Sequence, residues 1–484
     1  MPGNSDTLPS QALPAVFSIC RLTTLVASLI VALCSGTNYV CLAYAPQLGH
    51  RLQISHTQLN IIGLAGNVGV YSTGPIWGRI VDTRGPRILL ACAFFLLLSG
   101  YSGIRHLYDT GLAENVKTLS IPSFILLVMC GFVSGAGGNA GLTSGINSTA
   151  KTFPDSLRAS TVGVVLSGFG LSAFLFSTIS RIAFPGDTSS FLFILSIGTA
   201  LPMIMGFFLV RPIPIPSTLN AHGRQNAQQH ITRRRALIMG DVGLTNVFGR
   251  RLARSSDFWL LFTILSLLSG TGLMYINNVG SMSQALYAAK NPEYDEVEAT
   301  RWQATQVSSI SIMNFSGRIF IGVVNDICKN RLGLPRSYSL VLVSLFVFIS
   351  QVATARVDSV ENLWLASSLL GLGYGSVFSL LPTMCLEWFG MPHFSENWGY
   401  LSMAPMVAGN LFSVAFGRNL DAHDGKTRAE VPRCLLGREC YVDTLYLTIG
   451  ACSLSILLSA WAGWRDREKM RKAAGFNGDE DVLN

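Results

Sequence analysis

Apolar stretches of the length needed to cross a membrane recur along the whole chain, separated by short polar segments. A transmembrane helix needs about 20 mostly apolar residues, and twelve stretches meet that requirement. The expected spans are 18–44, 58–81, 87–106, 121–146, 158–182, 190–211, 257–282, 303–326, 338–356, 361–386, 396–417 and 443–464. This pattern predicts an all-α membrane protein with twelve transmembrane helices.

The composition favours the same class. Of the 484 residues, 49% are hydrophobic and 13% are charged, whereas a soluble domain carries about 25% charged residues. The net charge of +8 lies mainly in loops, so we interpret it as a sign of membrane orientation and expect no nucleic-acid partner. Residues 1–17 lack the apolar run of a signal peptide, so we expect the first span to be an uncleaved anchor.

The longest polar interior stretch, residues 212–256, separates the first six spans from the last six and is rich in arginine. Because basic loops stay on the cytoplasmic side, we expect this loop and both termini to be cytoplasmic. The predicted organisation is a tail over 1–17, a six-helix bundle over 18–211, the basic loop over 212–256, a second six-helix bundle over 257–464 and a tail over 465–484.

Short motifs recur in the two halves. Ser35-Gly-Thr37 in the first span corresponds to Ser269-Gly-Thr271 in the seventh, and Gly135-Ala-Gly137 in the fourth corresponds to Gly371-Leu-Gly373 in the tenth. The two pairs are offset by nearly the same number of residues. Internal repeats of this kind are typical of transporters, so we expect two pseudo-symmetric bundles.

The loops after the second and eighth spans also correspond, because Gly78 precedes Asp82 by four residues, as Gly322 precedes Asp326. With Gly85 and Arg87, the first loop resembles the hallmark motif of the major facilitator superfamily; Thr83 and Pro86 depart from it. The resemblance covers essentially the whole chain and implies a cytoplasmic gate in which Asp82 pairs with basic groups. The alternative is that Asp82 only caps a helix. The residues of this expected gate are Gly78, Asp82, Gly85, Arg87, Gly322 and Asp326.

Within that superfamily, the stretches Gly36-Thr-Asn-Tyr39 and Tyr44-Ala-Pro46 resemble nodulin-like transporters and the fungal homologues of monocarboxylate transporters. This resemblance implies a vacuolar membrane, with the plasma membrane as the alternative. Arg318-x-x-x-Gly322-x-x-x-Asp326 is similar to the monocarboxylate carriers, which usually have Asp where this chain has Asn314. That departure favours facilitated diffusion, or transport of a proton already carried by the acid, over carboxylate-based proton coupling.

Arg318 is the one ionisable residue expected deep within a span, roughly 12 Å from the cytoplasmic helix end at 1.5 Å per residue. A charge at the bilayer centre costs about 2.5–3.5 kcal/mol or more and commonly marks a solute pathway. No carboxylate lies in the middle of an expected span, and a guanidinium matches a carboxylate in bidentate fashion. We therefore expect a small organic anion, such as a monocarboxylate, as the solute. Alternatively, Arg318 reaches toward Asp326, Glu387 or helix carbonyls.

Uncharged polar residues within the spans are further candidates for solute contact. We single out those that flank Arg318 or the repeated glycine motifs: Asn314, Asn38, Tyr39, Asn277 and Tyr374. The alternative for each is an interhelical hydrogen bond, worth about 0.6 kcal/mol on average.

The sequence has no Walker motif, no metal-ligand spacing and no catalytic motif. We therefore expect a secondary, non-ATP transporter that works by alternating access, without a cofactor or enzymatic activity, as a monomer in the bilayer. One alternative is a drug or toxin efflux carrier, although the fifth span lacks the Gly-Pro signature of many such antiporters. Another is a non-transporting sensor or scaffold whose basic loop binds anionic lipid or a partner.

Two cysteines, Cys434 and Cys440, share one polar loop on the expected non-cytoplasmic side. In an oxidising compartment they could form a disulfide; the alternative is two free thiols.

Overall fold

The structure, a computed structural model, describes residues 18–54, 56–112, 119–214, 246–291, 295–423 and 435–480. These ranges are almost entirely helical, and no strand occurs within them. Eleven helices there are long and apolar enough to cross a membrane. The predicted all-α membrane fold is thereby confirmed.

The first half of the chain contains α1 (Ile19–Ser35), η1 (Thr37–Val40), α2 (Cys41–Leu52), α3 (His56–Ser72), α4 (Gly74–Arg84), α5 (Pro86–Thr110), α6 (Ile121–Thr152), α7 (Asp155–Ala183) and α8 (Thr188–Leu209). The second half contains α10 (Arg250–Ala253), α11 (Ser256–Lys290), α12 (Glu296–Leu332), α13 (Tyr338–Arg356), η2 (Val360–Asn362), α14 (Leu363–Phe389), α15 (Phe394–Leu401), α16 (Ala404–His423), η3 (Gly437–Cys440) and α17 (Val442–Glu480).

Three expected spans are interrupted. The span over 18–44 breaks at Gly36, and the span over 396–417 breaks between α15 and α16. The span over 58–81 consists of α3, with 17 residues, and α4, with 11 residues, on either side of Thr73. Each of these two is too short to cross alone, so together they provide a twelfth crossing among the residues that the structure describes.

The first break brings two helices close together. A Cβ atom at Gly36 would lie 2.6 Å from the carbonyl oxygen of Phe169 on α7, so only glycine permits this approach. The backbone there leaves the α-helix and continues in the 3-10 helix η1. The apolar pattern continues across the break, which explains why the sequence predicted one uninterrupted helix.

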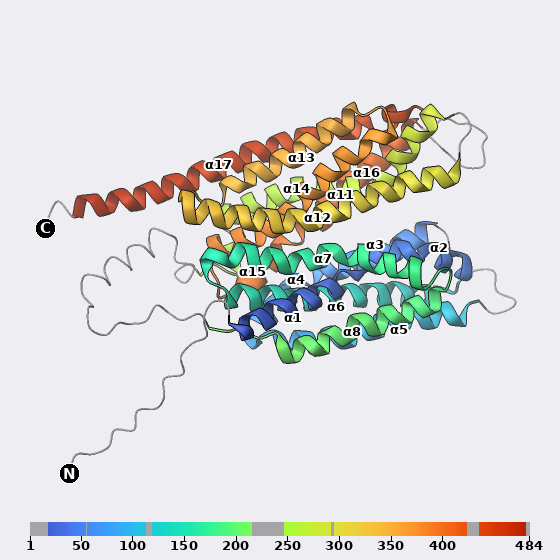
Figure 1. Ribbon diagram of the computed structural model, residues 1–484, viewed down its shortest axis with the longest axis horizontal. Helices are drawn as coiled ribbons and strands as arrows, with labels where there is room; N and C mark the ends of the chain where they lie inside the picture. Colours follow the sequence, from blue (N-terminus) through green and yellow to red (C-terminus); the bar gives the residue numbers. More distant parts are fainter. Residues whose placement is uncertain are drawn as a thin grey trace, which may run out of the picture.

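The two halves lie side by side, with helices α1–α8 in one layer and most of α10–α17 in the other (Figure 1). At their boundary, α7 packs against α12, and the short α15 crosses over to pack against α4. We call the end where α1 begins and α17 ends the terminal end. The opposite end, where α5 and α11 end, is the far end.

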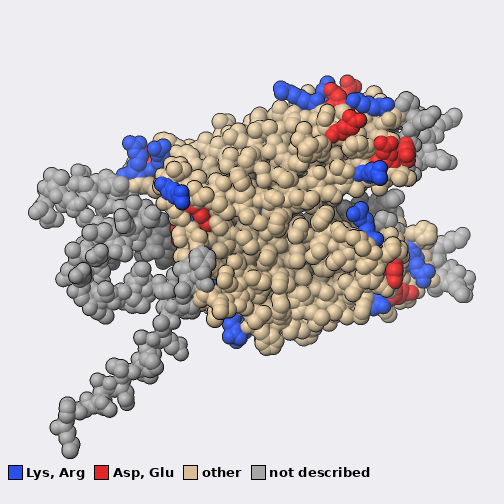
Figure 2. Space-filling view, in the orientation of Figure 1, with Lys and Arg blue, Asp and Glu red and all other residues tan. Residues whose placement is uncertain are grey.

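On the face shown in Figure 2, charged residues gather at both ends of the molecule, and the surface between them is uncharged. Large apolar side chains are exposed along this belt, among them Phe95 on α5, Leu411 on α16 and Leu457 on α17. A soluble protein rarely exposes apolar surface this extensively. The belt is the surface expected to face lipid.

The segments that flank the basic loop are both anchored at the terminal end. On the first half, Arg21 Nη2 donates to the carbonyl of Pro214 at 2.9 Å, and the Thr24 hydroxyl donates to the carbonyl of Arg211 at 3.3 Å. On the second half, the amide of Val247 donates to the carbonyl of Phe389 at 3.0 Å. Residues 215–245, most of the predicted loop, and the predicted tail over 1–17 lie outside the described residues.

Cys440, in η3 at the far end, is disulfide-bonded. Cys434 lies outside the described residues, so the predicted pairing of these two cysteines stays a prediction.

Candidate functional site

Arg318 lies in the middle of the molecule, on α12, with 3% of its surface exposed. Its guanidinium therefore does not point toward the lipid-facing surface. Its Nη1 donates to the carbonyl oxygen of Leu166 on α7 at 2.7 Å. A Cβ atom at Gly170, one turn along α7, would lie 3.1 Å from Nε of Arg318. The glycine thus lets the guanidinium lie against the opposite half of the protein.

The rest of the guanidinium is only partly engaged. Its Nε donates to Oδ1 of Asn314, one helical turn earlier, at 3.2 Å. Within the described ranges, Nη2 has no hydrogen-bond partner and no carboxylate pairs with Arg318. Of the alternatives raised by the sequence, the contact with a helix carbonyl is present, and contacts with Asp326 and Glu387 are not found.

Two phenylalanine rings approach the guanidinium from opposite halves. Its Cζ lies 5.7 Å from the ring centroid of Phe169 on α7 and 5.8 Å from that of Phe378 on α14. Cation–π contacts at such distances are favourable by about 0.5–2 kcal/mol. They offset part of the cost of burying the charge.

Three tyrosines lie near the same group. The hydroxyls of Tyr39 on η1 and Tyr71 on α3 are hydrogen-bonded to each other at 2.9 Å. Tyr374, on α14, fills the space beside Gly272, where any Cβ would collide with its ring. We call the set Tyr39, Tyr71, Phe169, Arg318, Tyr374 and Phe378 the central cluster.

The structure brings together most of the candidate residues predicted from sequence. Arg318, Asn314, Tyr39 and Tyr374 meet in the central cluster or contact it. Asn38 neighbours Tyr39 in η1 and donates to Oδ1 of Asn67 at 2.7 Å. Asn277 is exposed, and no hydrogen bond joins it to the cluster in the described part of the chain.

Tyr71, Phe169 and Phe378 were not singled out from sequence. Aromatic residues in apolar spans carry no positional signal, because lipid-facing and cavity-facing rings look alike. Tyr71 had one usable clue: it follows Asn67 by four residues, which places both on one helix face.

At the terminal end, Asp82 of α4 reaches across to α15. Its Oδ2 accepts hydrogen bonds from the amides of Ser395 at 2.9 Å and Glu396 at 3.0 Å. Its Oδ1 accepts from Nδ2 of Asn147 on α6 at 2.6 Å. The N-cap residue of α15, His393, makes no capping hydrogen bond of its own. Asp82 therefore caps a helix of the other half, and we call this contact the first latch.

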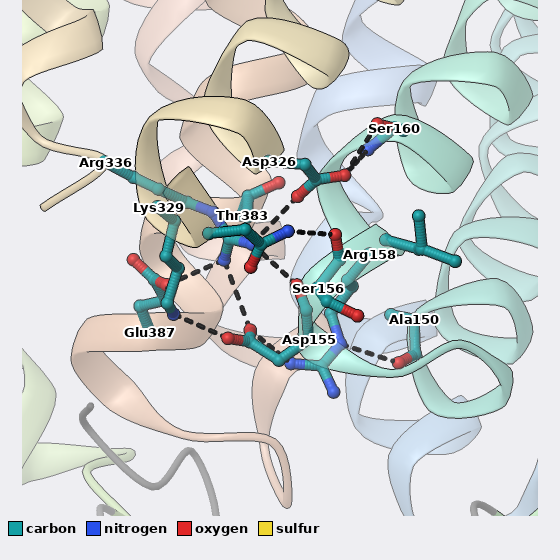
Figure 3. Close-up of polar contacts among 12 residues, drawn as sticks. Ala150, Asp155, Ser156, Arg158, Ser160, Asp326, Lys329, Arg336, Thr383 and Glu387 are labelled. Carbon is teal, nitrogen blue, oxygen red and sulfur yellow. Dashed lines mark hydrogen bonds and ion pairs between the residues drawn. The ribbon is translucent and has the colours of Figure 1, made fainter. Parts of the chain in front are cut away.

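Asp326 of α12 makes the reciprocal contact with α7 (Figure 3). Its Oδ2 accepts from the amide of Ser160 at 2.8 Å and from the Ser160 hydroxyl at 2.6 Å. Its Oδ1 accepts from Nη2 of Arg336 at 3.0 Å. Each half thus places a carboxylate on a helix of the other, and we call this contact the second latch.

Arg336, in the turn between α12 and α13, is the centre of the second latch; its side chain is 0% exposed. It forms ion pairs with Asp326, with Glu387 at 2.6 Å and with Asp155 of α7 at 3.3 Å (Figure 3). Burial alone would lower the pKa of Arg336, but the surrounding carboxylates, Glu387 foremost, raise it above its ordinary value. Lys329 adds a second bridge to Asp155, at 2.6 Å.

Glycines let the latches close. A Cβ at Gly78 would collide with the backbone of Ser395, and a Cβ at Gly322 would lie 2.7 Å from the carbonyl oxygen of Ala159. Gly85 has φ +81° and ends α4 after the first latch. Arg87 is exposed. The family resemblance implied basic partners for Asp82. Its hydrogen-bond donors are two backbone amides and the Asn147 amide, and the basic residue that acts on it electrostatically is Lys151.

The described residues contain no group of three or more potential metal ligands among their His, Cys, Asp and Glu side chains.

Comparison with known proteins agrees with this architecture. A family model described as Major Facilitator Superfamily matches residues 25–413. "Probable transporter MCH1" of Wickerhamomyces anomalus is 24% identical over 411 residues, which cover 82% of this chain and 79% of that protein. The protein of the same name in Gibberella zeae is 23% identical over 521 residues, covering 92% and 90%.

Among solved structures, a bacterial homologue of the iron transporter ferroportin, in an outward-facing state with soaked iron, superimposes with a TM-score of 0.61. The identity is 15%, and the match covers 92% of this chain and 99% of that one. At this identity the likeness shows a shared fold.

Proposed function

The chain belongs to the major facilitator superfamily of secondary membrane transporters, and we propose that its solute is a small organic anion such as a monocarboxylate. The observation that carries this proposal is the buried Arg318 without a carboxylate partner within the described ranges. Burying an uncompensated charge is costly, so an anionic solute would supply the missing counter-charge.

The geometry around Arg318 supports a binding role. Its Nη2 has no partner in the described part of the chain, while Nε and Nη1 are held by Asn314 and Leu166. Contacts come from both halves, because Phe169 belongs to the first and Phe378 to the second. A solute bound there would contact both moving bodies, as alternating access requires.

The two latches supply the other element of that mechanism. Both lie at the terminal end, and both join the first half to the second, through Asp82 with Ser395 and Asp326 with Ser160. We propose that they hold this end closed while the solute exchanges at the far end. Their release would open the terminal end.

The remaining features are proposed on the family resemblance and the charge pattern. The terminal end would be cytoplasmic, and the membrane would be vacuolar, with the plasma membrane as the alternative. A fluorescent fusion to the full chain would locate the protein. Because Asn314 replaces the Asp of the monocarboxylate carriers, we propose transport without a proton relay; strict dependence on a proton gradient would contradict this.

The proposal is tested by uptake into proteoliposomes at neutral pH, with protein-free liposomes subtracted. Radiolabelled lactate, pyruvate and benzoate would be compared with a neutral sugar and a zwitterionic amino acid. We expect uptake of at least one carboxylate, and its loss in Arg318→Gln and Arg318→Lys. Arg301→Gln, at an exposed arginine near the start of α12, is the matched control. Equal uptake by wild type and both Arg318 variants would refute an anion site at Arg318.

A further inference from the structure

We infer that the preferred solute is an aromatic carboxylate, whose carboxylate binds Arg318 while its ring packs among the side chains of the central cluster. This inference rests on the proposed function, an anion site at Arg318, and narrows its chemical class. The observation behind this inference is that aromatic side chains lie next to Arg318.

Aromatic rings form a wall on each side of the guanidinium. On the first half, Tyr39 meets Phe169 edge to face, with ring centroids 6.0 Å apart and planes at 90°. On the second half, Tyr374 packs against Phe378 at 4.9 Å. Aromatic pairs prefer edge-to-face or offset geometry at such distances. A planar ring that enters between these walls would make the same kind of contact with both halves.

Apart from the Arg318 guanidinium, the only polar side-chain groups of the central cluster are the hydroxyls of its three tyrosines. The hydroxyls of Tyr39 and Tyr71 share one hydrogen bond, and Oδ1 of the neighbouring Asn314 accepts from Arg318. A solute with several hydroxyl groups would leave some of them unpaired on burial, which costs about 1–3 kcal/mol each. An aromatic monocarboxylate needs only the guanidinium as a hydrogen-bond donor. A very small acid such as acetate would neutralise the charge of Arg318 but would cover little of the ring surface.

The rings are less buried than the charge. Tyr39, Phe169 and Phe378 are half-buried, whereas Arg318 and Tyr374 are 3% and 6% exposed. Three rings of the central cluster therefore leave part of their surface uncovered beside an almost fully buried guanidinium. Such a site discriminates by ring contact in addition to charge.

The test is calorimetric binding to the full-length protein in lipid nanodiscs, which avoids passive leakage of protonated acids. The probes are benzoate and cyclohexanecarboxylate, which share a carboxylate and a six-carbon ring but differ in planarity and π character. We expect benzoate to bind about tenfold more tightly, as an added aromatic pair predicts. Acetate should bind more weakly than either.

Variants assign the preference to particular rings. Phe169→Leu and Phe378→Leu keep apolar bulk but remove one ring each, and either should reduce the preference for benzoate to about threefold or less. Phe95→Leu, at an exposed position on α5, should retain the wild-type ratio. Two ring variants are used so that a folding defect in one does not remove the test.

Different failures have different meanings. If wild type binds both probes equally and Arg318→Gln abolishes both, the aromatic preference is wrong and the anion site stands. If the preference is present but survives both ring variants, the assignment to this cluster is wrong. If neither probe binds, or Arg318→Gln binds both as wild type does, the proposed function fails together with the inference.

Discussion

The carboxylate of Asp82 in the first half accepts the backbone amide of Ser395 in the second half at 2.9 Å, in the first turn of α15. An N-cap residue normally plays this role within its own helix. Here the cap is supplied across the boundary between two bodies. The backbone amides at the start of α15 have this hydrogen-bond acceptor only while the halves are together at the terminal end. The hydrogen bond is therefore sensitive to the separation of the two halves.

Replacing Asp82 should therefore change the balance between conformations in which the terminal end is closed and conformations in which it is open. Asp82→Ala removes a cap worth about 0.5–2 kcal/mol, which shifts that balance toward the open terminal end by up to about 30-fold. Asp82→Asn should recover much of the loss, because asparagine also caps well. Spin-label distances between positions 84 and 467 would report the shift. Asp187→Ala removes a cap within one half, at Ser190, and should leave the distances unchanged.

Gly78→Ala should prevent the first latch from closing. Its Cβ would collide with the backbone of Ser395, and overpacking of this kind costs about 1–3 kcal/mol. We expect transport to fall about tenfold, with the protein still folded. Gly450→Ala is the matched control, because nothing lies within 4 Å of a Cβ at that helical position. Full transport by Gly78→Ala would show that this close approach is dispensable.

Arg336→Met should destabilise the fold. It leaves the carboxylates of Asp155, Asp326 and Glu387 without their shared counter-ion, and breaking a buried pair costs about 3–5 kcal/mol. Thermal unfolding of the purified protein measures the loss. Arg438→Met removes an exposed ion pair with Asp358, whose side chains are 43% and 66% exposed, and should cost no more than about 1 kcal/mol. Equal losses would mean that the second latch is not a stabilising centre.

Asn397→Ala should loosen the segment that follows the basic loop. The Asn397 side chain is fully buried and donates to the carbonyl of Val247 at 2.8 Å. Phe248 stacks on His393 beside it, with ring centroids 3.8 Å apart. Losing the hydrogen bond costs about 0.5–1.5 kcal/mol, so amide exchange over 246–253 should quicken by roughly tenfold or less. Asn410→Ala removes only a bond within α16 and should leave that exchange unchanged.

Deleting residues 220–235 should leave transport intact, because the expected role of the basic loop is to set orientation. Enough basic residues remain in 236–254 to keep that loop cytoplasmic. Uptake into proteoliposomes is the measurement, with the folded state checked by size-exclusion chromatography. Loss of uptake by a folded deletion variant would favour the alternative in which this loop binds a regulatory lipid or partner.

Much of the architecture follows from local sequence properties. The lengths of the apolar stretches identified the spans. The position of Arg318, well before the end of its span, predicted a guanidinium deep among helices with Asn314 one turn away. Both are found. These predictions succeed because burial of a long apolar run is forced by the bilayer, whatever the tertiary packing.

The failures depend on contacts between distant segments. The interruption at Gly36 lies where Phe169 on another helix approaches the backbone, and nothing near position 36 records that neighbour. Arg336 looks like an ordinary loop arginine in sequence, yet it is fully buried because three carboxylates from separate helices converge on it. The aromatic walls around Arg318 were missed for the same reason.

The anchored ends of the central loop have a mechanical consequence. Pro214 is held by Arg21 in one half, and Val247 is held by Phe389 and Asn397 in the other. A chain of 31 residues can span up to roughly 100 Å, so the length of the link between these anchors does not limit the separation of the halves. A polypeptide cut within residues 215–245 should therefore still yield two fragments that find each other and work as one carrier.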